Sequence, residues 1–163
     1  MDQQRLAALY RRYGPAAYAR CRKLLRDEAL AEDAVQEVFV RVLRHLDKAP
    51  DDEAALGWIY RISTNYCLNL LRDRAAQAEP VDELPEGTTG DLEAVLSDRD
   101  ACLRVLARMP DKLRAPAVLH YLDGLEQGRV AEVLGVSRRT VINRLAAFAD
   151  RARKLLEPSG GLE

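Results

Sequence analysis

LEQGRVAEVLGVSRRTVINRLAAFADRARKLL, residues 125–156, contains two helical patterns separated by a glycine. The first pattern is a short helix with one apolar side, made of Val130, Ala131, Val133 and Leu134. Gly135 ends this helix, because glycine readily adopts the left-handed conformation at a helix C-terminus. Ser137 follows, where its side-chain oxygen can cap the next helix. A tight turn between two such helices is typical of a helix-turn-helix.

The second helix of this motif has a polar and basic N-terminal half. Three apolar residues are expected to point inward, namely Val141, Leu145 and Phe148. The exposed half then carries Arg138, Arg139, Thr140, Asn143 and Arg144. Arginine can pair with a guanine edge, asparagine with adenine, and threonine and the helix N-terminus with phosphate. A basic amphipathic helix can also be an ordinary soluble surface, but the complete turn signature favours DNA binding.

An acidic segment precedes this motif. Residues 75–98, AAQAEPVDELPEGTTGDLEAVLSD, contain seven acidic residues, no basic residue, two prolines and two glycines. This is the composition of a linker. We therefore predict a first domain over residues 1–76, a flexible linker over 77–97 and a second domain over 98–158.

The charge of the whole chain is only -1, which by itself argues weakly against nucleic-acid binding. Its distribution changes this interpretation. Residues 1–74 carry 13 basic against 11 acidic residues, and residues 99–163 carry 12 against 8. Two mildly basic segments thus flank the acidic one.

The fold class predicted from apolar spacing is all-α, with two small helical domains. Apolar residues recur three and four positions apart, so the first domain reads as four helices without a convincing strand. We expect these helices at Gln3–Tyr13, closed by Gly14, and at Pro15–Leu25, Ala29–Leu46 and Glu53–Arg74. After the linker we expect helices near Leu92–Met109 and Pro110–Tyr121. Pro116 predicts a kink or a later start in the latter, because proline lacks a backbone N–H.

Two of these helices have distinctive polar faces. In Ala29–Leu46, the side opposite the apolar stripe includes Asp33, Gln36, Glu37 and Arg41. In Glu53–Arg74, one face carries Trp58, Arg61, Asn65, Asn69 and Arg72. An indole, amides and guanidiniums can stack on unpaired bases, contact base edges and hold phosphates. The alternative is that the indole is half-buried core and the arginines are solvated.

Several function classes have no support in the sequence. The three cysteines, Cys21, Cys67 and Cys102, have no metal-binding or disulfide spacing, and His45 and His120 stand alone. We find no phosphate loop or nucleophile motif, so we expect no enzyme, cofactor, metal or small-molecule substrate. No apolar run approaches the roughly 20 residues that span a bilayer, and the N-terminus is polar. We expect a cytoplasmic protein without direct membrane insertion.

Three motifs together resemble the extracytoplasmic-function (ECF) sigma factor family of bacterial RNA polymerase. Residues 31–46, AEDAVQEVFVRVLRHL, are similar to the family's polymerase-binding helix, and residues 57–74, GWIYRISTNYCLNLLRDR, to its minus-ten helix. MPDKLR at 109–114 and DGLEQGRVAEVLGVSRRTVINRL at 123–145 are similar to its C-terminal domain. The resemblance covers roughly residues 5–157, with the motifs in the family's order.

This resemblance implies an alternative sigma factor that binds core RNA polymerase and promoter DNA. Residues 1–76 would be sigma region 2 and residues 98–158 sigma region 4. Asp33, Gln36, Glu37 and Arg41 would belong to the polymerase-binding helix. Trp58, Arg61, Asn65, Asn69 and Arg72 would face the minus-ten element, and a loop at about 47–54 would capture a flipped base. Arg138, Arg139, Thr140, Asn143 and Arg144 would contact the minus-thirty-five element.

The resemblance also implies a path for the linker and a regulatory partner. The acidic linker would thread the RNA exit path of the polymerase. An anti-sigma factor, often a membrane protein, would hold the chain inactive. Exposed apolar positions around Val40 and Leu43 would suit such a partner.

Several positions depart from the family pattern. Asn69 stands where many members have Asp. Glu126 replaces a capping Ser, and Arg129 replaces a Glu, so the start of the first motif helix is expected to be less well supported. After Leu145 the family has a basic run, whereas this chain has AAFAD, so weaker backbone contacts are expected there.

The main alternative from another class is a free-standing helix-turn-helix regulator with an N-terminal effector or dimerisation domain. Such a protein binds duplex DNA unaided, usually as a symmetric dimer on a palindrome. It gives no explanation for the AEDAVQEVF face.

Overall fold

The structure, a computed structural model, describes residues 2–51, 53–78 and 91–157. In the first two ranges the elements are α1 (Asp2–Leu25), α2 (Glu28–Arg44), a short 3-10 helix (Leu46–Lys48) and α3 (Glu53–Ala78). In the third they are α4 (Leu92–Ser97), α5 (Arg99–Leu106), α6 (Asp111–Ala117), a π-helix (Val118–Leu122), α7 (Gln127–Leu134) and α8 (Arg138–Leu156). These ranges contain no strand, as the all-α prediction requires.

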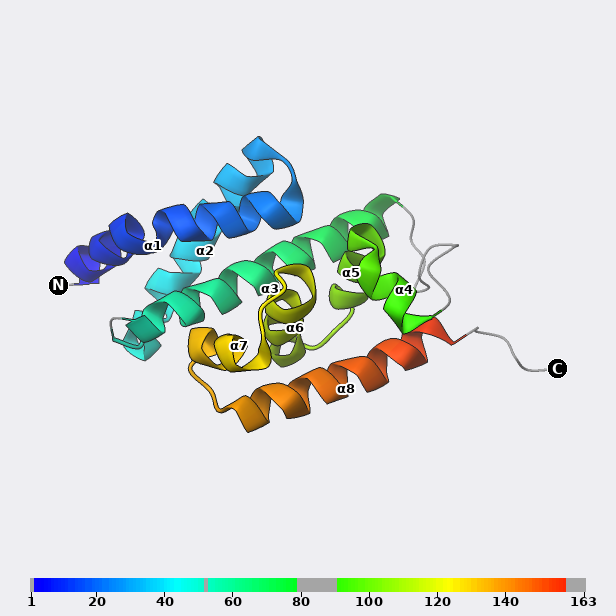
Figure 1. The fold of residues 1–163 in the computed structure, drawn as a ribbon. Helices are drawn as coiled ribbons and strands as arrows, with labels where there is room; N and C mark the ends of the chain where they lie inside the picture. The colour runs from blue at the N-terminus through cyan, green and yellow to red at the C-terminus, as the bar shows by residue number, and fades with distance from the viewer. Residues whose placement is uncertain (1, 52, 79–90, 158–163) are drawn as a thin grey trace.

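The long helix α3 is central in the molecule (Figure 1). Helices α1 and α2 pack on one side of it, while α6 and α7 lie on its other side, with α8 beyond them. The core of the first domain consists of apolar side chains from all three of its helices, including Cys21, Val38, Val42, Ile59 and Leu68. The second domain builds its core around Phe148, which is fully buried.

The prediction that Gly14 closes a first helix is wrong. Helix α1 runs without interruption through Gly14 and Pro15. Proline removes only the backbone hydrogen bond to the Arg11 carbonyl. The buried face continues across this point from Tyr13 through Ala17 to Cys21, so packing against α2 and α3 outweighs the local break signal.

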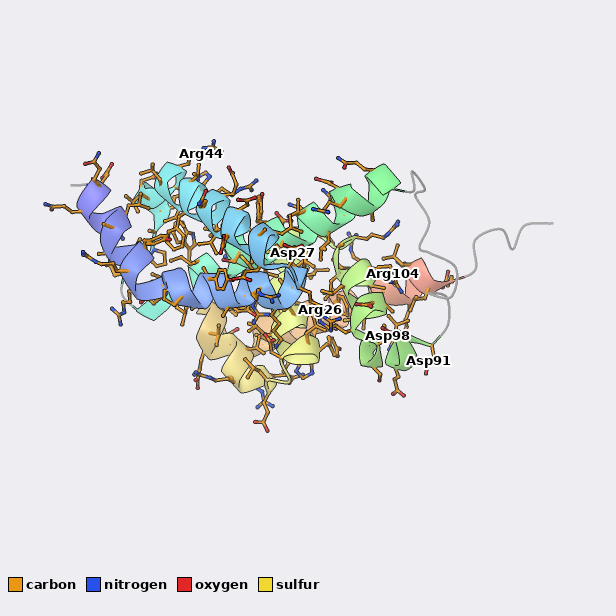
Figure 2. The ribbon with its side chains drawn as sticks, turned by 90° about the horizontal axis from the view of Figure 1, so that it is seen from above. Arg26, Asp27, Arg44, Asp91, Asp98 and Arg104 are labelled. Atoms are coloured by element: carbon orange, nitrogen blue, oxygen red, sulfur yellow. The ribbon has the colours of Figure 1, made fainter. Side chains whose placement is uncertain are left out.

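The predicted helix Leu92–Met109 is instead two helices. Asp98 separates them, and its side-chain oxygen accepts hydrogen bonds from the backbone N–H groups of Asp100 (3.0 Å) and Ala101 (3.3 Å), which caps α5. Figure 2 shows Asp98 at this junction. Leu92 and Val95 of α4 are buried, so residues that the sequence assigned to the linker pack with the second domain.

The later helix start considered for Pro116 is not found, because α6 begins at Asp111; the helix instead becomes irregular after the proline. Pro116 lies inside α6, and the chain widens into the π-helix two residues later. The Asp123 N–H donates to the Val118 carbonyl, five residues earlier, at 3.0 Å. This extra residue in the turn ends the helix at Asp123 and Gly124, just before the helix-turn-helix.

The helix-turn-helix forms as predicted. Gly135 ends α7 in the left-handed conformation, with φ of 68°. The Ser137 side-chain oxygen accepts a hydrogen bond from the Thr140 backbone N–H at 3.1 Å. Val141, Leu145 and Phe148 are buried, so the polar side of α8 faces outward.

Replacing Ser137 tests the cap of α8. Ser137→Ala removes the oxygen that accepts from the Thr140 N–H, and we expect it to lower the free energy of unfolding by about 1 kcal/mol. Ser137→Asp keeps an acceptor at a helix N-terminus and serves as the control. Urea denaturation measures both, and equal losses for the two variants would contradict the capping role.

Candidate nucleic-acid interface

The N-terminal half of α8 presents its polar side chains to solvent. Arg138, Arg139 and Asn143 are exposed, whereas Thr140 and Arg144 are half-buried. The Thr140 hydroxyl lies 2.9 Å from the Ser137 hydroxyl, so both belong to the cap. The residues predicted to contact the minus-thirty-five element therefore lie together on the outward side of α8.

The predicted polymerase-binding residues also form one open surface. Asp33, Gln36, Glu37 and Arg41 are all exposed on α2. Phe39 packs behind them and is 6% exposed. The Arg41 guanidinium lies 5.1 Å from the centre of the Tyr66 ring, which holds it over α3. The start of α2 is fixed by Asp27, whose carboxylate accepts from the Leu30 N–H at 2.9 Å.

The predicted minus-ten residues share one face of α3 but differ in exposure. Arg61 and Arg72 are exposed, whereas Trp58, Asn65 and Asn69 are half-buried. The half-burial of Trp58 agrees with the alternative interpretation of this face, in which the indole is half-buried core. The face is therefore only partly accessible.

The loop that precedes α3 is held by Arg5, which no sequence motif singled out. Its guanidinium donates to the carbonyls of Leu46 (3.2 Å) and Ala49 (3.0 Å) and lies 3.6 Å from the Asp51 carboxylate. Of the loop predicted at 47–54, Asp52 lies outside the described residues. An arginine at the start of α1 thus positions the residues that lead into α3.

Arg114 is a buried arginine that bonds to α3. It is 1% exposed, and within its own domain it donates to the carbonyls of Leu106 (3.2 Å) and Ala107 (2.7 Å). Its remaining nitrogen donates to the Asn69 side-chain oxygen at 2.6 Å and to the Asn65 carbonyl at 3.4 Å. Burial lowers the pKa of Arg114, which the nearby Asp111 carboxylate partly offsets. Arg114 is the last residue of the MPDKLR motif, but the motif predicts none of its partners.

Asp123 is a second contact point between the domains. Its carboxylate accepts hydrogen bonds from the Tyr60 hydroxyl (2.7 Å), Arg20 and Lys23. Burial alone would raise the pKa of Asp123, but the hydrogen bonds from Arg20 and Lys23 outweigh it and hold the pKa below its ordinary value. Arg20 also lies over the Tyr60 ring, 4.1 Å from its centre. No local motif predicted this cluster, because the partners of Asp123 lie 63 to 103 residues from it in the sequence.

Comparison with known proteins identifies the family. The Sigma-70 region 2 family matches residues 9–77, and the Sigma-70 region 4 family matches residues 99–156. The ECF RNA polymerase sigma factor SigM of Mycobacterium tuberculosis is 30% identical over 156 residues, which are 95% of this chain and 79% of SigM. The chain belongs to the ECF RNA polymerase sigma factor family.

Two further relatives of this sigma factor extend over nearly its whole length. The ECF sigma factor SigW of Bacillus subtilis is 26% identical over 170 residues, covering 95% of this chain and 90% of SigW. A solved structure of CnrH in complex with the cytosolic domain of CnrY is 25% identical, covers 97% of this chain and 91% of that chain, and has a TM-score of 0.47.

Membership confirms the function class expected from the three motifs. An ECF sigma factor binds core RNA polymerase and directs initiation at promoters that carry minus-thirty-five and minus-ten elements. The free-standing regulator considered above is not supported by these matches, because both sigma regions are present in one chain.

The three cysteines and His120 of this sigma factor lie in or beside the core. Cys21, Cys67 and Cys102 are buried and free. The Nδ1 atom of His120 lies 2.7 Å from the Leu125 carbonyl oxygen. The described part of the chain holds no group of three or more His, Cys, Asp and Glu side chains suited to a metal ion. Among the described residues, no helix is both long and apolar enough to cross a membrane.

Proposed function

We propose that this sigma factor recognises minus-thirty-five DNA through the N-terminal half of α8. The observation that carries this proposal is the exposure of Arg138, Arg139 and Asn143 at the start of a capped helix. These side chains can reach base edges in a major groove while the helix N-terminus approaches a phosphate. Thr140 and Arg144 lie beside them and would contact the DNA backbone.

The polymerase contact is proposed for α2. Asp33, Gln36, Glu37 and Arg41 are exposed on a helix whose other side is buried, so they can bind a partner without refolding. Asp33, Gln36 and Glu37 carry side-chain oxygens that can accept hydrogen bonds from basic groups of the partner. This surface would dock on the clamp helices of the largest polymerase subunit.

The minus-ten contact is proposed for α3 and for the loop before it. Trp58 can stack on an unpaired base, while Arg61 and Arg72 can hold phosphates. Asn65 and Asn69 carry side-chain amides that can hydrogen-bond to bases. Residues 47–54 would receive a flipped base, in a loop that Arg5 anchors.

The chain would act in the cytoplasm as a non-catalytic subunit under the control of an anti-sigma factor. Val40 and Leu43, on α2, are 38% and 46% exposed. Apolar side chains beside the proposed polymerase surface would let such a partner compete with polymerase for α2. A membrane-bound partner would also hold the chain at the membrane.

Run-off transcription tests the proposed function. Core RNA polymerase with this chain should produce specific transcript starts on fragmented genomic DNA, and the starts should share spaced minus-thirty-five and minus-ten elements. Core polymerase alone is the control. A chain that produces no starts but shifts duplex DNA unaided would contradict the proposal.

Asn143→Ala tests recognition by α8. Loss of an amide that pairs with a base edge should weaken binding of the holoenzyme to its preferred promoter by about 10-fold, within the range of 1–3 kcal/mol for one such contact, and should relax the preference at one base pair. Arg151→Ala removes an exposed charge about two turns farther along α8 and should leave the base preference unchanged. Competition binding against single-base variants of the promoter measures both. An unchanged base preference in Asn143→Ala would contradict the assignment.

Glu37→Lys tests the α2 surface. Reversal of an exposed charge in a complementary interface should weaken binding to core polymerase about tenfold while leaving the stability of the free chain nearly unchanged. Glu93→Lys, an exposed reversal on α4, is the matched control. Fluorescence anisotropy of labelled chain with core polymerase gives the affinity, and equal binding by the two variants would exclude Glu37 from the contact.

A further inference from the structure

One large apolar side chain of the second domain is exposed to solvent. Ile142 of α8 is 41% exposed, and no other large hydrophobic residue in the described range 91–157 is as exposed. Its neighbours Val141 and Leu145 are buried in the core. Helix α8 itself lies at an edge of the molecule (Figure 1). Single apolar residues are common on protein surfaces, so the position of Ile142 must decide whether it has a role.

Ile142 lies in the middle of the surface proposed to contact minus-thirty-five DNA. Residues three and four positions apart are neighbours on a helix, so Ile142 adjoins Arg138, Arg139 and, one turn later, Ala146. Asn143 follows it directly in the sequence. All four of these residues are exposed. An apolar side chain is thus surrounded by the groups that would pair with base edges.

The stability of α8 does not account for an isoleucine at this position. Branching at Cβ restricts the side chain, so isoleucine favours a helix less than alanine, leucine, arginine or lysine does. Apolar atoms that stay in water also contribute no burial energy to the fold. The same branching holds the side chain in one preferred rotamer, so it loses little freedom when it contacts a partner. Ile142 therefore suits binding better than folding.

The chemistry around Ile142 indicates a partner that carries both negative charge and an apolar group. The guanidiniums of Arg138 and Arg139 favour a polyanion, and the capped N-terminus of α8 favours a phosphate. In the major groove of DNA, the apolar group on the base edges is the C5-methyl group of thymine. Isoleucine cannot form hydrogen bonds, so a G·C pair opposite it would leave polar groups of both bases without partners.

Small residues on the next turn allow Ile142 to approach a base. Its side chain is shorter than that of arginine, so it reaches a base edge only if the helix backbone comes close to the DNA. Ala146 and Ala147 are exposed and present only methyl groups. The AAFAD stretch, which departs from the family's basic run, thus leaves this turn free to enter the groove.

We propose that Ile142 contacts the methyl group of a thymine in the minus-thirty-five element and so specifies an A·T pair at the position that it faces. This inference rests on the proposed function, because it assumes that the N-terminal half of α8 enters the major groove there. Arg138 and Arg139 are suited to guanine, and Asn143 to adenine. The element that this chain recognises therefore includes a thymine whose methyl group Ile142 selects.

Selection from a randomised promoter tests the proposal. The probe is a promoter obtained by run-off transcription with this chain, rebuilt with random bases across its minus-thirty-five region. Holoenzyme is allowed to bind the pool, and sequencing of the bound molecules gives the preference at each position. With the wild-type chain, one position should prefer an A·T pair in one orientation. Ile142→Ala should reduce that preference about fourfold, the worth of one buried methyl group, and should keep the others.

Two controls show that the loss comes from the contact. Ile142→Val retains a branched apolar side chain and should keep most of the preference for thymine. Ile142→Ala changes an exposed position to a better helix former, so urea denaturation should find it at least as stable as the wild-type chain. Loss of the preference in both variants to the same extent would contradict a contact made by the branched side chain.

Removal of the methyl group from the DNA isolates the contact from the other side. Deoxyuridine in place of the selected thymine keeps the base pair and deletes only the C5-methyl group. Wild-type holoenzyme should bind the substituted promoter about fourfold more weakly, whereas Ile142→Ala holoenzyme should bind both promoters equally. Equal weakening of both holoenzymes would overturn the proposal, because the methyl group would then act without Ile142.

Further outcomes separate this inference from the proposed function. If Asn143→Ala relaxes the base preference but Ile142→Ala does not, α8 recognises DNA without Ile142 and only this inference fails. It also fails if Ile142→Ala weakens binding to core polymerase in fluorescence anisotropy with an unchanged base preference, because the partner is then a protein. Absence of specific starts in run-off transcription would reject the proposed function, and this inference with it.

Discussion

The burial of one positive charge, that of Arg114, is the constraint on which the arrangement of the domains depends. A guanidinium removed from water is costly unless its donors are bonded. Two donors are bonded by the carbonyls at the end of α5, which fixes α6 against α5. The remaining nitrogen faces α3, where Asn69 and the Asn65 carbonyl accept from it. That nitrogen also donates to the Asp111 carboxylate at 3.3 Å, so one side chain links the internal packing of the second domain to its contact with the first.

Local signals in the sequence are sufficient wherever an element is made by neighbouring residues. The cap at Ser137 and the glycine turn at Gly135 act over three or four positions, so their pattern alone identifies α7 and α8. Pro15 shows where this reasoning stops. Its break signal is real in an isolated helix, but the buried row from Tyr13 to Cys21 belongs to packing against α2 and α3, which no local window contains.

The candidate sites also divide into those that one helix defines and those that residues distant in the sequence define. The exposed residues of α2 and α8 could be identified because each set lies on one helix and within one motif. The contacts of Asn65 and Asn69 could not, because the Arg114 side chain that bonds to them lies 45 to 49 residues away. The sequence did not predict the roles of Gly57, Asp123 and Arg5 for the same reason. Glycines, aspartates and arginines are common on surfaces, and only the partner that each meets reveals its role.

Gly57 of α3 lies against the backbone of α7, where an added Cβ atom would be 1.9 Å from the Val133 carbonyl oxygen. This contact has a consequence for how the protein can diverge. A substitution at that position cannot be accommodated by a rotamer change nearby, because the atoms that it meets belong to the main chain of α7. Any descendant that acquires a side chain there must lose the seat of α7 on α3, or shift the whole helix. Gly57 therefore limits how this chain can vary, because a side chain there and the present approach of α7 to α3 exclude each other.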